Sequence, residues 1–432
     1  MKISGWGRYP IRDAKITYPQ TRDELTCLVK DHSLIARGLG RSYGDSANNN
    51  LVTQTNYLDH YITFDRNTGI LNCEAGLTIA ELLELIVPYG WFLPVSPGTS
   101  NVTLGGAIAS DVHGKNHHFS GTFSQHVICL EIMLGSGEIK TTSVNALPDL
   151  FHATCGGMGL TGIILAATIQ LIPIKSAQIN QKTIKAANLE EVCQQFELYA
   201  ASTYSVAWID CLSTGKNLGR SLLMLGEHAC QGSLQLKPTR ALSMPMDLPS
   251  SLLNQHSIKV FNSLYYLKHS KSNQTTTLPL KSYFYPLDAI SDWNRMYGKK
   301  GFFQYQFVLP KEVGSKGLQS ILEVIAQSGM GSFLAVLKAF GPSNQNLLSF
   351  PKEGFTLALD FKASNDAFKL AARLDAMVLD YAGRLYLAKD ALMQASFFKQ
   401  SYPQWEQFQA TRAKYGAIGK FSSDQSRRLG LD

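Results

Sequence analysis

The chain has 432 residues, of which 45% are hydrophobic and 17% are charged. This balance is ordinary for a folded protein and excludes extensive disorder, and the length predicts two or more domains. The formal net charge of +7 is not gathered into runs of Lys and Arg, so we expect no nucleic-acid partner, whereas an anionic substrate, an anionic cofactor or an acidic membrane surface would each suit it.

In the N-terminal half, up to about Pro173, short apolar segments alternate with glycine turns. The expected elements are strands at 34–37, 127–134 and 160–172 and a helix at 77–89. The helix begins after Gly76 and ends at Gly90, a residue type that commonly terminates helices.

From Ile174 onward the sequence pattern changes, because it predicts longer amphipathic helices between the strands. The expected elements are helices at 189–200 and 317–327 and strands at 302–309, 333–340 and 355–361. Strands mixed with helices on this scale predict an α+β fold whose second domain is built on an antiparallel sheet.

Between about Gln231 and Leu280 the sequence becomes polar and rich in Pro, Ser, Asn and Thr, and the part from Ser257 to Lys271 interleaves lysines with Phe, Tyr and Leu. A mobile surface insertion is the favoured interpretation, in line with long loops generally. The alternative is a lid that also rests on a membrane, since cationic and aromatic side chains together suit a lipid interface.

The seven cysteines are widely spaced and form no CxxC pair. We therefore expect neither a disulfide framework nor a zinc site, and a reducing compartment is the natural location. The N-terminal sequence MKISGWGRYP lacks the apolar core of a signal peptide, and no segment offers about 18 uninterrupted apolar residues. We expect a cytoplasmic protein, with a peripheral contact to the inner face of the membrane left open.

Three glycine-rich segments stand out in the N-terminal half, at 37–45, 96–111 and 155–163. Glycines let a backbone turn tightly and bring its N–H groups against phosphate oxygens. The first segment resembles a dinucleotide fingerprint only in part, because its spacing is G-x-G-x-x-x-G and residues 46–50 have loop chemistry instead of a helical pattern. A plain turn would explain one such segment, whereas three together indicate a long phosphate-bearing ligand held at several points.

A histidine-containing stretch, 112–118, directly follows the second glycine segment. Metal binding is the less favoured interpretation, because the HExxH spacing is absent and no Cys or carboxylate cluster lies nearby in the sequence. We therefore expect no metal and interpret the stretch as a polar cluster beside the ligand.

The C-terminal half predicts a polar pocket. The alternation at 303–307 places Gln304 and Gln306 on one face of a strand and three aromatic residues on the other. Lys338 and Lys389 lie among large apolar residues, where an ammonium group is costly unless something anionic meets it. A solvated sheet face or a lysine reaching water would explain each element alone, whereas together they favour a pocket.

Several segments, in this order, resemble one family. They are RGLGRSYGDSANN, GGAIASDVHGKNHH, GGMGLTGII, QYQFVLP, SFLAVLKAFGP, RLYLAKD and FSSDQSRRL. The family is that of the flavin subunit of the decaprenylphosphoryl-β-D-ribose 2′-epimerase, within the vanillyl-alcohol-oxidase superfamily of PCMH-type FAD enzymes. The resemblance implies a two-subdomain FAD domain at 1–173, a substrate (cap) domain at 174–390 with an insertion around 231–280, and a C-terminal segment at 391–432 that returns to the FAD domain.

The resemblance implies FAD as the cofactor. The implied FAD-binding residues are Gly38, Leu39, Gly40, Arg41, Ser42, Tyr43, Gly44, Asp45, Gly98, Thr103, Leu104, Gly105, Gly106, Ala109, Ser110, His113, Gly114, Ile163 and Tyr386. Relatives that oxidise sugar lactones or alditols often carry a His bonded covalently to the flavin where this chain has Arg41. We therefore expect FAD to be bound without a covalent link.

The implied catalytic and pocket residues are Tyr43, Lys115, Gln304, Gln306, Lys338, Tyr386 and Lys389. We expect Lys389, beside Tyr386, to act as the base or alkoxide stabiliser, because partial desolvation lowers the pKa of a lysine. The other two lysines would neutralise a phosphate or organise the pocket. The family often has Asn and Cys where this chain has Thr356 and Ala358, so inhibitors that attack that thiol are expected to fail here.

The implied reaction is oxidation of a secondary sugar hydroxyl, most directly the 2′-hydroxyl of a polyprenylphosphoryl ribose, by hydride transfer to flavin N5. The alternatives are an aldonolactone or alditol oxidase that uses dioxygen, and a non-catalytic flavin-binding partner. The expected partners are a lipid-linked phospho-sugar and, for epimerisation, an NADH-dependent short-chain reductase.

Overall fold

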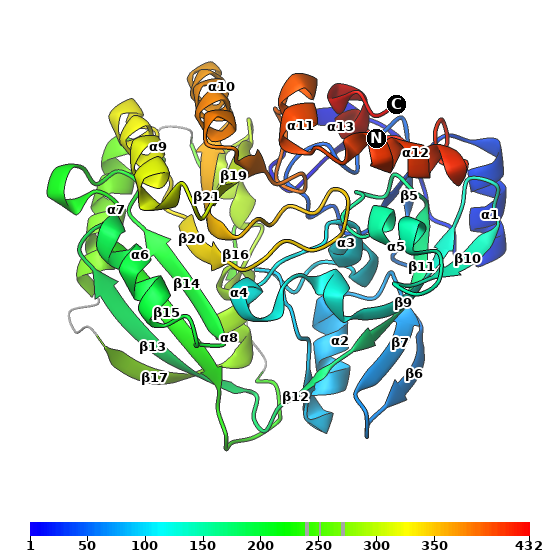
Figure 1. Ribbon diagram of the computed structural model, residues 1–432, viewed down its shortest axis with the longest axis horizontal. Helices are drawn as coiled ribbons and strands as arrows, with labels where there is room; N and C mark the ends of the chain where they lie inside the picture. The colour runs from blue at the N-terminus through cyan, green and yellow to red at the C-terminus, as the bar shows by residue number, and fades with distance from the viewer. Residues whose placement is uncertain (238–241, 250–251, 269–272) are drawn as a thin grey trace.

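The computed structural model describes residues 1–237, 242–249, 252–268 and 273–432. Two large sheets organise it, one from each half of the sequence, and they lie side by side in Figure 1. The combination of these sheets with helices that pack on them confirms the predicted α+β fold.

The sheet of the N-terminal half has five antiparallel strands. Its order is β10 (Ile139–Thr142), β9 (Val127–Met133), β11 (Ile163–Gln170), β7 (Ile70–Glu74) and β6 (Tyr61–Asp65). The central strand β11 is buried along most of its length, as its apolar run predicts.

The predicted helix at 77–89 is confirmed as α2 (Ile79–Ile86) followed by a 3-10 turn, η1 (Val87–Tyr89). Thr78 and Glu81 form a capping box at its start, which satisfies backbone N–H groups that the first turn leaves free. Gly90 ends the turn with a φ of 80°, a conformation that favours glycine.

A smaller parallel sheet carries the first glycine segment. Its order is β3 (Lys15–Thr17), β5 (Leu51–Gln54) and β4 (Ile35–Arg37), and helix α1 (Arg22–Asp31) connects β3 to β4. Gly38 follows β4 directly, and residues 38–50 form turns without a helix. The prediction of loop structure after this glycine segment is therefore confirmed.

The sheet of the C-terminal half has eight antiparallel strands. Its order is β17 (Gln274–Pro279), β13 (Gln178–Ala186), β15 (Ser221–His228), β14 (Tyr204–Ile209), β20 (Ala335–Phe340), β21 (Gly354–Lys362), β19 (Phe302–Pro310) and β22 (Arg384–Leu385). Helices α6 (Leu189–Leu198), α9 (Gly314–Ser328) and α10 (Asn365–Asp380) cover one face with their apolar sides (Figure 1). The opposite face of this sheet carries polar side chains that line a cavity.

The described residues of the 231–280 region contain more regular structure than the composition of that region predicts. Helix α7 (Gln255–Lys268) lies against the large sheet, and β17 extends that sheet by pairing with β13. The buried Asn262 of α7 donates to Asp210 at 2.8 Å, and Arg220 donates to Ser263 at 2.9 Å. Polar residues on the edge strand and on the exposed side of α7 made this part resemble a loop. Residues 238–241, 250–251 and 269–272, with Lys271 among them, lie outside the described residues.

The last forty residues form α11 (Ala395–Ser401), α12 (Trp405–Lys414) and α13 (Asp424–Leu429). Helix α12 packs against α5 (Pro148–Thr154) of the N-terminal half, whereas α11 packs against α10, β22 and α13. The two termini lie close together in Figure 1. Phe421 forms a parallel bridge with Leu34. Arg428 donates to Asp45 at 2.6 Å and to Asp390 at 3.0 Å, which joins three distant parts of the sequence.

The remaining elements are short. They are β1 (Lys2–Ser4), β2 (Ile11–Asp13), β8 (Trp91–Phe92), β12 (Ile172–Pro173), β16 (Leu242–Ser243), β18 (Ile290–Ser291), α3 (Leu104–Ala109), α4 (His117–Ser120), α5 (Pro148–Thr154), α8 (Leu280–Phe284), η2 (Phe123–His126), η3 (Gly215–Asn217), η4 (Pro286–Ala289) and η5 (Trp293–Tyr297). Over the described residues, the helices are all too short or too polar to cross a bilayer.

Candidate active site

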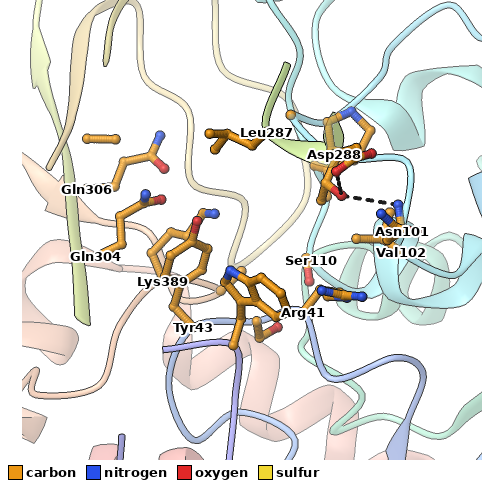
Figure 2. Close-up of a pocket in the computed structure, with 18 of the residues that line it drawn as sticks. Arg41, Tyr43, Asn101, Val102, Ser110, Leu287, Asp288, Gln304, Gln306 and Lys389 are labelled. Atoms are coloured by element: carbon orange, nitrogen blue, oxygen red, sulfur yellow. Dashed lines mark hydrogen bonds between the residues drawn. The ribbon is translucent and has the colours of Figure 1, made fainter. Parts of the chain in front are cut away.

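A cavity of about 1280 Å³ lies between the glycine segments of the N-terminal half and the polar face of the eight-stranded sheet. Figure 2 shows Gln304, Gln306 and Lys389 on one side of it, with Arg41 and Asp288 across from them. Both walls carry residues that the sequence singled out. The predicted residues that line the cavity are Gly38, Leu39, Gly40, Arg41, Ser42, Tyr43, Gly98, Thr103, Gly105, Gly106, Ala109, Ser110, His113, Gly114, Lys115, Ile163, Gln304, Gln306, Lys338, Tyr386 and Lys389.

Three predicted cofactor residues lie behind this lining. Asp45 is 3% exposed and its carboxylate is paired with Arg428, so it supports the loop instead of facing a ligand. Leu104 is fully buried in the core under the small N-terminal helices. Gly44 is packed against the backbone of Asp390, where an added Cβ would overlap the carbonyl oxygen. A contiguous motif does not show which of its residues turn away from the ligand.

The glycine wall allows a ligand to approach the backbone. Gly40 has a φ of 63°, and a Cβ added there would overlap the guanidinium of Arg37. Arg37 is held in place by hydrogen bonds to the carbonyl of Ser4 at 2.6 Å and to that of Ala47 at 3.1 Å. A Cβ added at Gly98 would meet nothing within 4 Å, so this glycine borders open space.

Within the described residues, the backbone N–H groups of 39–42 donate to no protein acceptor. Backbone donors that line a cavity without a partner are the groups that bind phosphate oxygens in glycine-rich loops. The loop therefore fits the pyrophosphate of a dinucleotide, and the volume of the cavity, about 1280 Å³, has room for such a cofactor.

The opposite wall is a buried hydrogen-bond network on β19 and β21. Gln304 donates to Asp360 at 2.6 Å, and Tyr297 donates to the same carboxylate at 3.2 Å. Burial raises the pKa of Asp360 to about 7, against the opposing effect of the Gln304 hydrogen bond. Gln306 is held between Thr356, at 3.2 Å from its amide nitrogen, and the ring of His113 at 3.1 Å. Both glutamines are thereby oriented before any ligand binds.

Three lysines, Lys115, Lys338 and Lys389, line the same cavity, and we call them the lysine cluster. Burial lowers the pKa of Lys115 to about 7, that of Lys338 to about 8 and that of Lys389 to about 7. Lys338 lowers the pKa of the other two further, because like charges disfavour a second protonation. The cluster is consequently a site where an anion would be stabilised.

Aromatic rings position two of these lysines. The Nζ atom of Lys389 lies 3.8 Å from the ring centre of Tyr43, and that of Lys115 lies 4.0 Å from the ring centre of Tyr283. Such contacts favour the cation and fix the direction of a flexible side chain. Tyr386 is oriented separately, since its hydroxyl donates to the carbonyl of Ser110 at 2.9 Å.

His113 is buried between these groups. Burial and the charge of Lys338 lower the pKa of its imidazole well below the ordinary value, so the ring is neutral at physiological pH. Its ring centre lies 5.1 Å from that of Tyr386. No group of three or more metal-ligating side chains occurs in the described ranges, this histidine stretch included. His113 therefore packs as part of the wall.

Among the cavity residues that sequence reasoning missed are Asp288 and Trp6, which come from distant segments. Asp288, in η4, accepts from the Thr99 hydroxyl at 2.6 Å and from the Ser100 backbone at 2.8 Å, which ties this segment to the second glycine segment (Figure 2). The ring of Trp6 lies 4.1 Å from the guanidinium carbon of Arg41. A single Asp or Trp outside any motif offers no pattern that would have identified it.

Ala358 lines the cavity, as the predicted strand pattern implies. The side chain at this position is a methyl group, and none of the cysteines belongs to the cavity lining within the described residues. A thiol-directed reagent therefore finds no cysteine thiol among the described residues of this wall.

Comparison with known proteins shows the family of the chain. A family model described as an FAD binding domain matches residues 15–143. The decaprenylphosphoryl-β-D-ribose oxidase of Mycolicibacterium smegmatis is 37% identical, over 100% of this chain and 97% of its own length. The chain belongs to this oxidase family. It is accordingly an FAD-dependent oxidoreductase, and the resemblance inferred from the sequence motifs is confirmed.

More distant relatives also cover most of the chain. The L-gulono-1,4-lactone dehydrogenase of Mycobacterium tuberculosis is 20% identical over 99% of this chain and 98% of its own length. An uncharacterized protein of Streptomyces coelicolor is 30% identical over 82% of this chain and 100% of its own length. As a member of the oxidase family, the chain has the PCMH-type FAD domain that the motifs predicted.

We expect Gly40→Ala to weaken FAD retention by at least about tenfold, because the new Cβ displaces Arg37 and strains a backbone with φ of 63°. Equilibrium dialysis with the flavin absorbance as the signal measures this. Gly416→Ala is a matched control, because its φ is 65° but an added Cβ meets nothing within 4 Å. Equal FAD retention in the two variants contradicts the role assigned to the loop.

Proposed function

We propose that this enzyme oxidises the 2′-hydroxyl group of a polyprenylphosphoryl pentose, with ribose as the favoured pentose. The lysine cluster carries this proposal, because amines that can be charged match a phosphate, and an amine that can be neutral matches a hydroxyl that must lose a proton. The oriented amides of Gln304 and Gln306 suit sugar hydroxyls. The name of the Mycolicibacterium smegmatis relative, a decaprenylphosphoryl-β-D-ribose oxidase, supports the same substrate class.

We propose that the first glycine segment holds the FAD pyrophosphate through the N–H groups of 39–42, helped by residues 103–106. Residues 109–114, Ile163 and Tyr386 would lie beside the flavin ring. Bound FAD supplies the acceptor for the hydride that leaves the carbinol carbon. Arg41, which lies over the ring of Trp6, offers no nucleophile to the flavin, so the cofactor is held without a covalent bond.

Lys389 is proposed to take the proton of the sugar hydroxyl at its Nζ atom. Its lowered pKa of about 7 leaves a substantial fraction of neutral amine near neutral pH, which a base requires. The ring of Tyr43 fixes the direction of this amine. Lys115 and Lys338 would meet the phosphate, and its charge would raise the pKa of both groups.

A sugar-lactone or alditol oxidase that uses dioxygen is the second candidate. The relative named L-gulono-1,4-lactone dehydrogenase, which aligns over nearly the whole chain, is the observation that favours it. A lactone carries no phosphate to meet the lysine cluster, which places this candidate after the phospho-sugar. The third candidate is a protein that binds flavin but does not catalyse a reaction. The lowered pKa of Lys389 and its fixed position over Tyr43 argue against this candidate, because both suit a catalytic base.

The substrate class has consequences for partners and location. A 2′-keto product becomes the epimer only if a second enzyme reduces it, so we propose an NADH-dependent short-chain reductase as the partner. A polyprenyl tail stays in a bilayer, so we propose that the protein works at the cytoplasmic surface of a membrane without spanning it.

The purified protein is expected to be yellow and to release its flavin into the supernatant on acid precipitation, because no covalent bond is expected. Anaerobic mixing with a polyprenylphosphoryl ribose should bleach the flavin absorbance, whereas L-gulono-1,4-lactone should bleach it far more slowly. Faster bleaching by the lactone favours the second candidate. A yellow protein that no sugar bleaches supports the non-catalytic one, and flavin that stays with the precipitate contradicts non-covalent binding.

A further inference from the structure

Helix α7 presents an apolar outer side that no described residue covers. Val260, Leu264 and Leu267 are 60%, 63% and 61% exposed, although each is a residue type usually found inside. Their i, i+4, i+7 spacing places them along one side of the helix. Leu252, which precedes the helix, is 52% exposed as well. Exposed apolar side chains gathered on one element indicate an interaction surface.

Charge around this side favours an anionic surface. Lys259 and Lys268 lie on either flank of the apolar side, given the helical positions of the residues. The sequence from 248 to 287 contains no Asp or Glu. Lysines that flank an apolar stripe and extend toward headgroups are the pattern of helices that lie in a lipid interface.

The inner side of the same helix belongs to the cavity. Phe261 and Tyr265 line it, and Ile258 is buried in the core. Asn262 holds the helix to the sheet through Asp210. Beside these rings, Trp208 lines the cavity, and its indole N–H donates to the carbonyl of Phe333 at 3.0 Å. Helix α7 thus separates the part of the cavity lined by Trp208, Phe261 and Tyr265 from the solvent.

We propose that α7 docks on an anionic lipid bilayer, with Val260, Leu264 and Leu267 in the headgroup layer and Lys259 and Lys268 at the lipid phosphates. The purpose of this docking rests on the proposed function. Docking would let the tail of a lipid-linked sugar stay in the bilayer while the sugar enters the cavity beside Phe261. A second copy of the chain is the less suitable occupant, because a stable dimer uses roughly 20–30 residues a side and this apolar side offers three.

Flotation with vesicles tests the proposal on the full-length flavoprotein. The wild type should float with vesicles of phosphatidylcholine and phosphatidylglycerol and much less with phosphatidylcholine alone, and added salt should reduce flotation. The double variant Leu264→Glu/Leu267→Glu should partition at least about tenfold more weakly, because two apolar contacts become like-charge repulsions. Val144→Glu is the matched control, because Val144 is 53% exposed beside β10, at the opposite end of the molecule (Figure 1). It should float as the wild type does.

Flavin reduction by a short-chain, water-soluble phospho-sugar separates this inference from the proposed function. The double variant should be reduced as fast as the wild type, because neither leucine lines the cavity. A wild type that is reduced but does not float overturns the docking proposal alone, and one that floats but is not reduced overturns the function alone. If the variant changes the sedimentation mass and no vesicle binding is seen, a second copy occupies the surface and the proposal is wrong.

Discussion

Lys389→Ala is expected to slow flavin reduction by the phospho-sugar by about 10²–10⁴-fold, the usual contribution of a positioned base. The variant loses the lysine that lies over the ring of Tyr43, whereas the glycine wall is untouched. FAD should therefore stay bound at the wild-type level. Rapid mixing under anaerobic conditions measures the rate, and the flavin absorbance of the purified variant measures the cofactor content.

The pH dependence gives a sharper form of the same test. Burial lowers the pKa of Lys389 to about 7, so the neutral amine becomes the main form as pH rises through that value. The wild-type rate should rise with pH in this range and then level off, and Lys389→Ala should lose this step. Lys338→Ala should shift the step to higher pH, because Lys338 lowers the pKa of Lys389.

Lys369→Ala is the matched control, since this lysine is exposed on α10 and its removal should leave the rate unchanged. An unchanged rate in Lys389→Ala itself removes this residue from the mechanism. If the rate falls but the pH step remains, Lys389 is a positioning residue and the base is another group.

Asp111→Ala is expected to have the largest effect on stability, a loss of roughly 3–5 kcal/mol in the free energy of unfolding. The side chain is fully buried, and its carboxylate accepts hydrogen bonds from four donors. The donors are the Ser124 backbone at 3.2 Å, Asn344 at 2.7 Å, Asn346 at 2.9 Å and Ser349 at 2.6 Å. Removing the acceptor leaves buried donors unpaired, which costs more than the hydrogen bonds contributed.

Urea denaturation measures this loss, and two variants show its cause. Asp111 has a φ of 40°, which Asn tolerates better than Ala. Asp111→Asn should therefore fall between the wild type and the Ala variant. Asp59→Ala, at an exposed position, should change stability by at most about 0.5 kcal/mol. If Asp111→Ala is as stable as Asp59→Ala, the network around Asp111 does not hold this part of the site.

The network also bears on the chemistry. Asp111 follows Ser110, whose carbonyl accepts from Tyr386. The hydrogen bonds of Asp111 also hold residues 344–349 against the segment 111–113, which ends at His113. Loosening it should reduce FAD retention in Asp111→Ala even where the variant is still folded, which dialysis can measure.

Much of the site could be predicted because it depends on local pattern. Strand alternation placed Gln304 and Gln306 on one face, since successive side chains of a strand point to opposite sides. The glycine segments indicated close backbone approach, and Gly40 has the positive φ that glycine permits. The regular structure at 255–268 and 274–279 was not predicted, because an edge strand and a helix with one exposed side need few apolar residues.

The sequence by itself determined the α+β class, the glycine wall, the polar faces and the cofactor family. Only the tertiary structure decided that Lys338 lowers the pKa of Lys115 and Lys389, and that Asp45 turns away from the cavity toward Arg428. The physical reason is the range of the interactions. Backbone conformation and side-chain alternation act between neighbours in sequence, whereas burial and the effect of Lys338 on the pKa values of the other two lysines depend on residues that only the folded chain brings together.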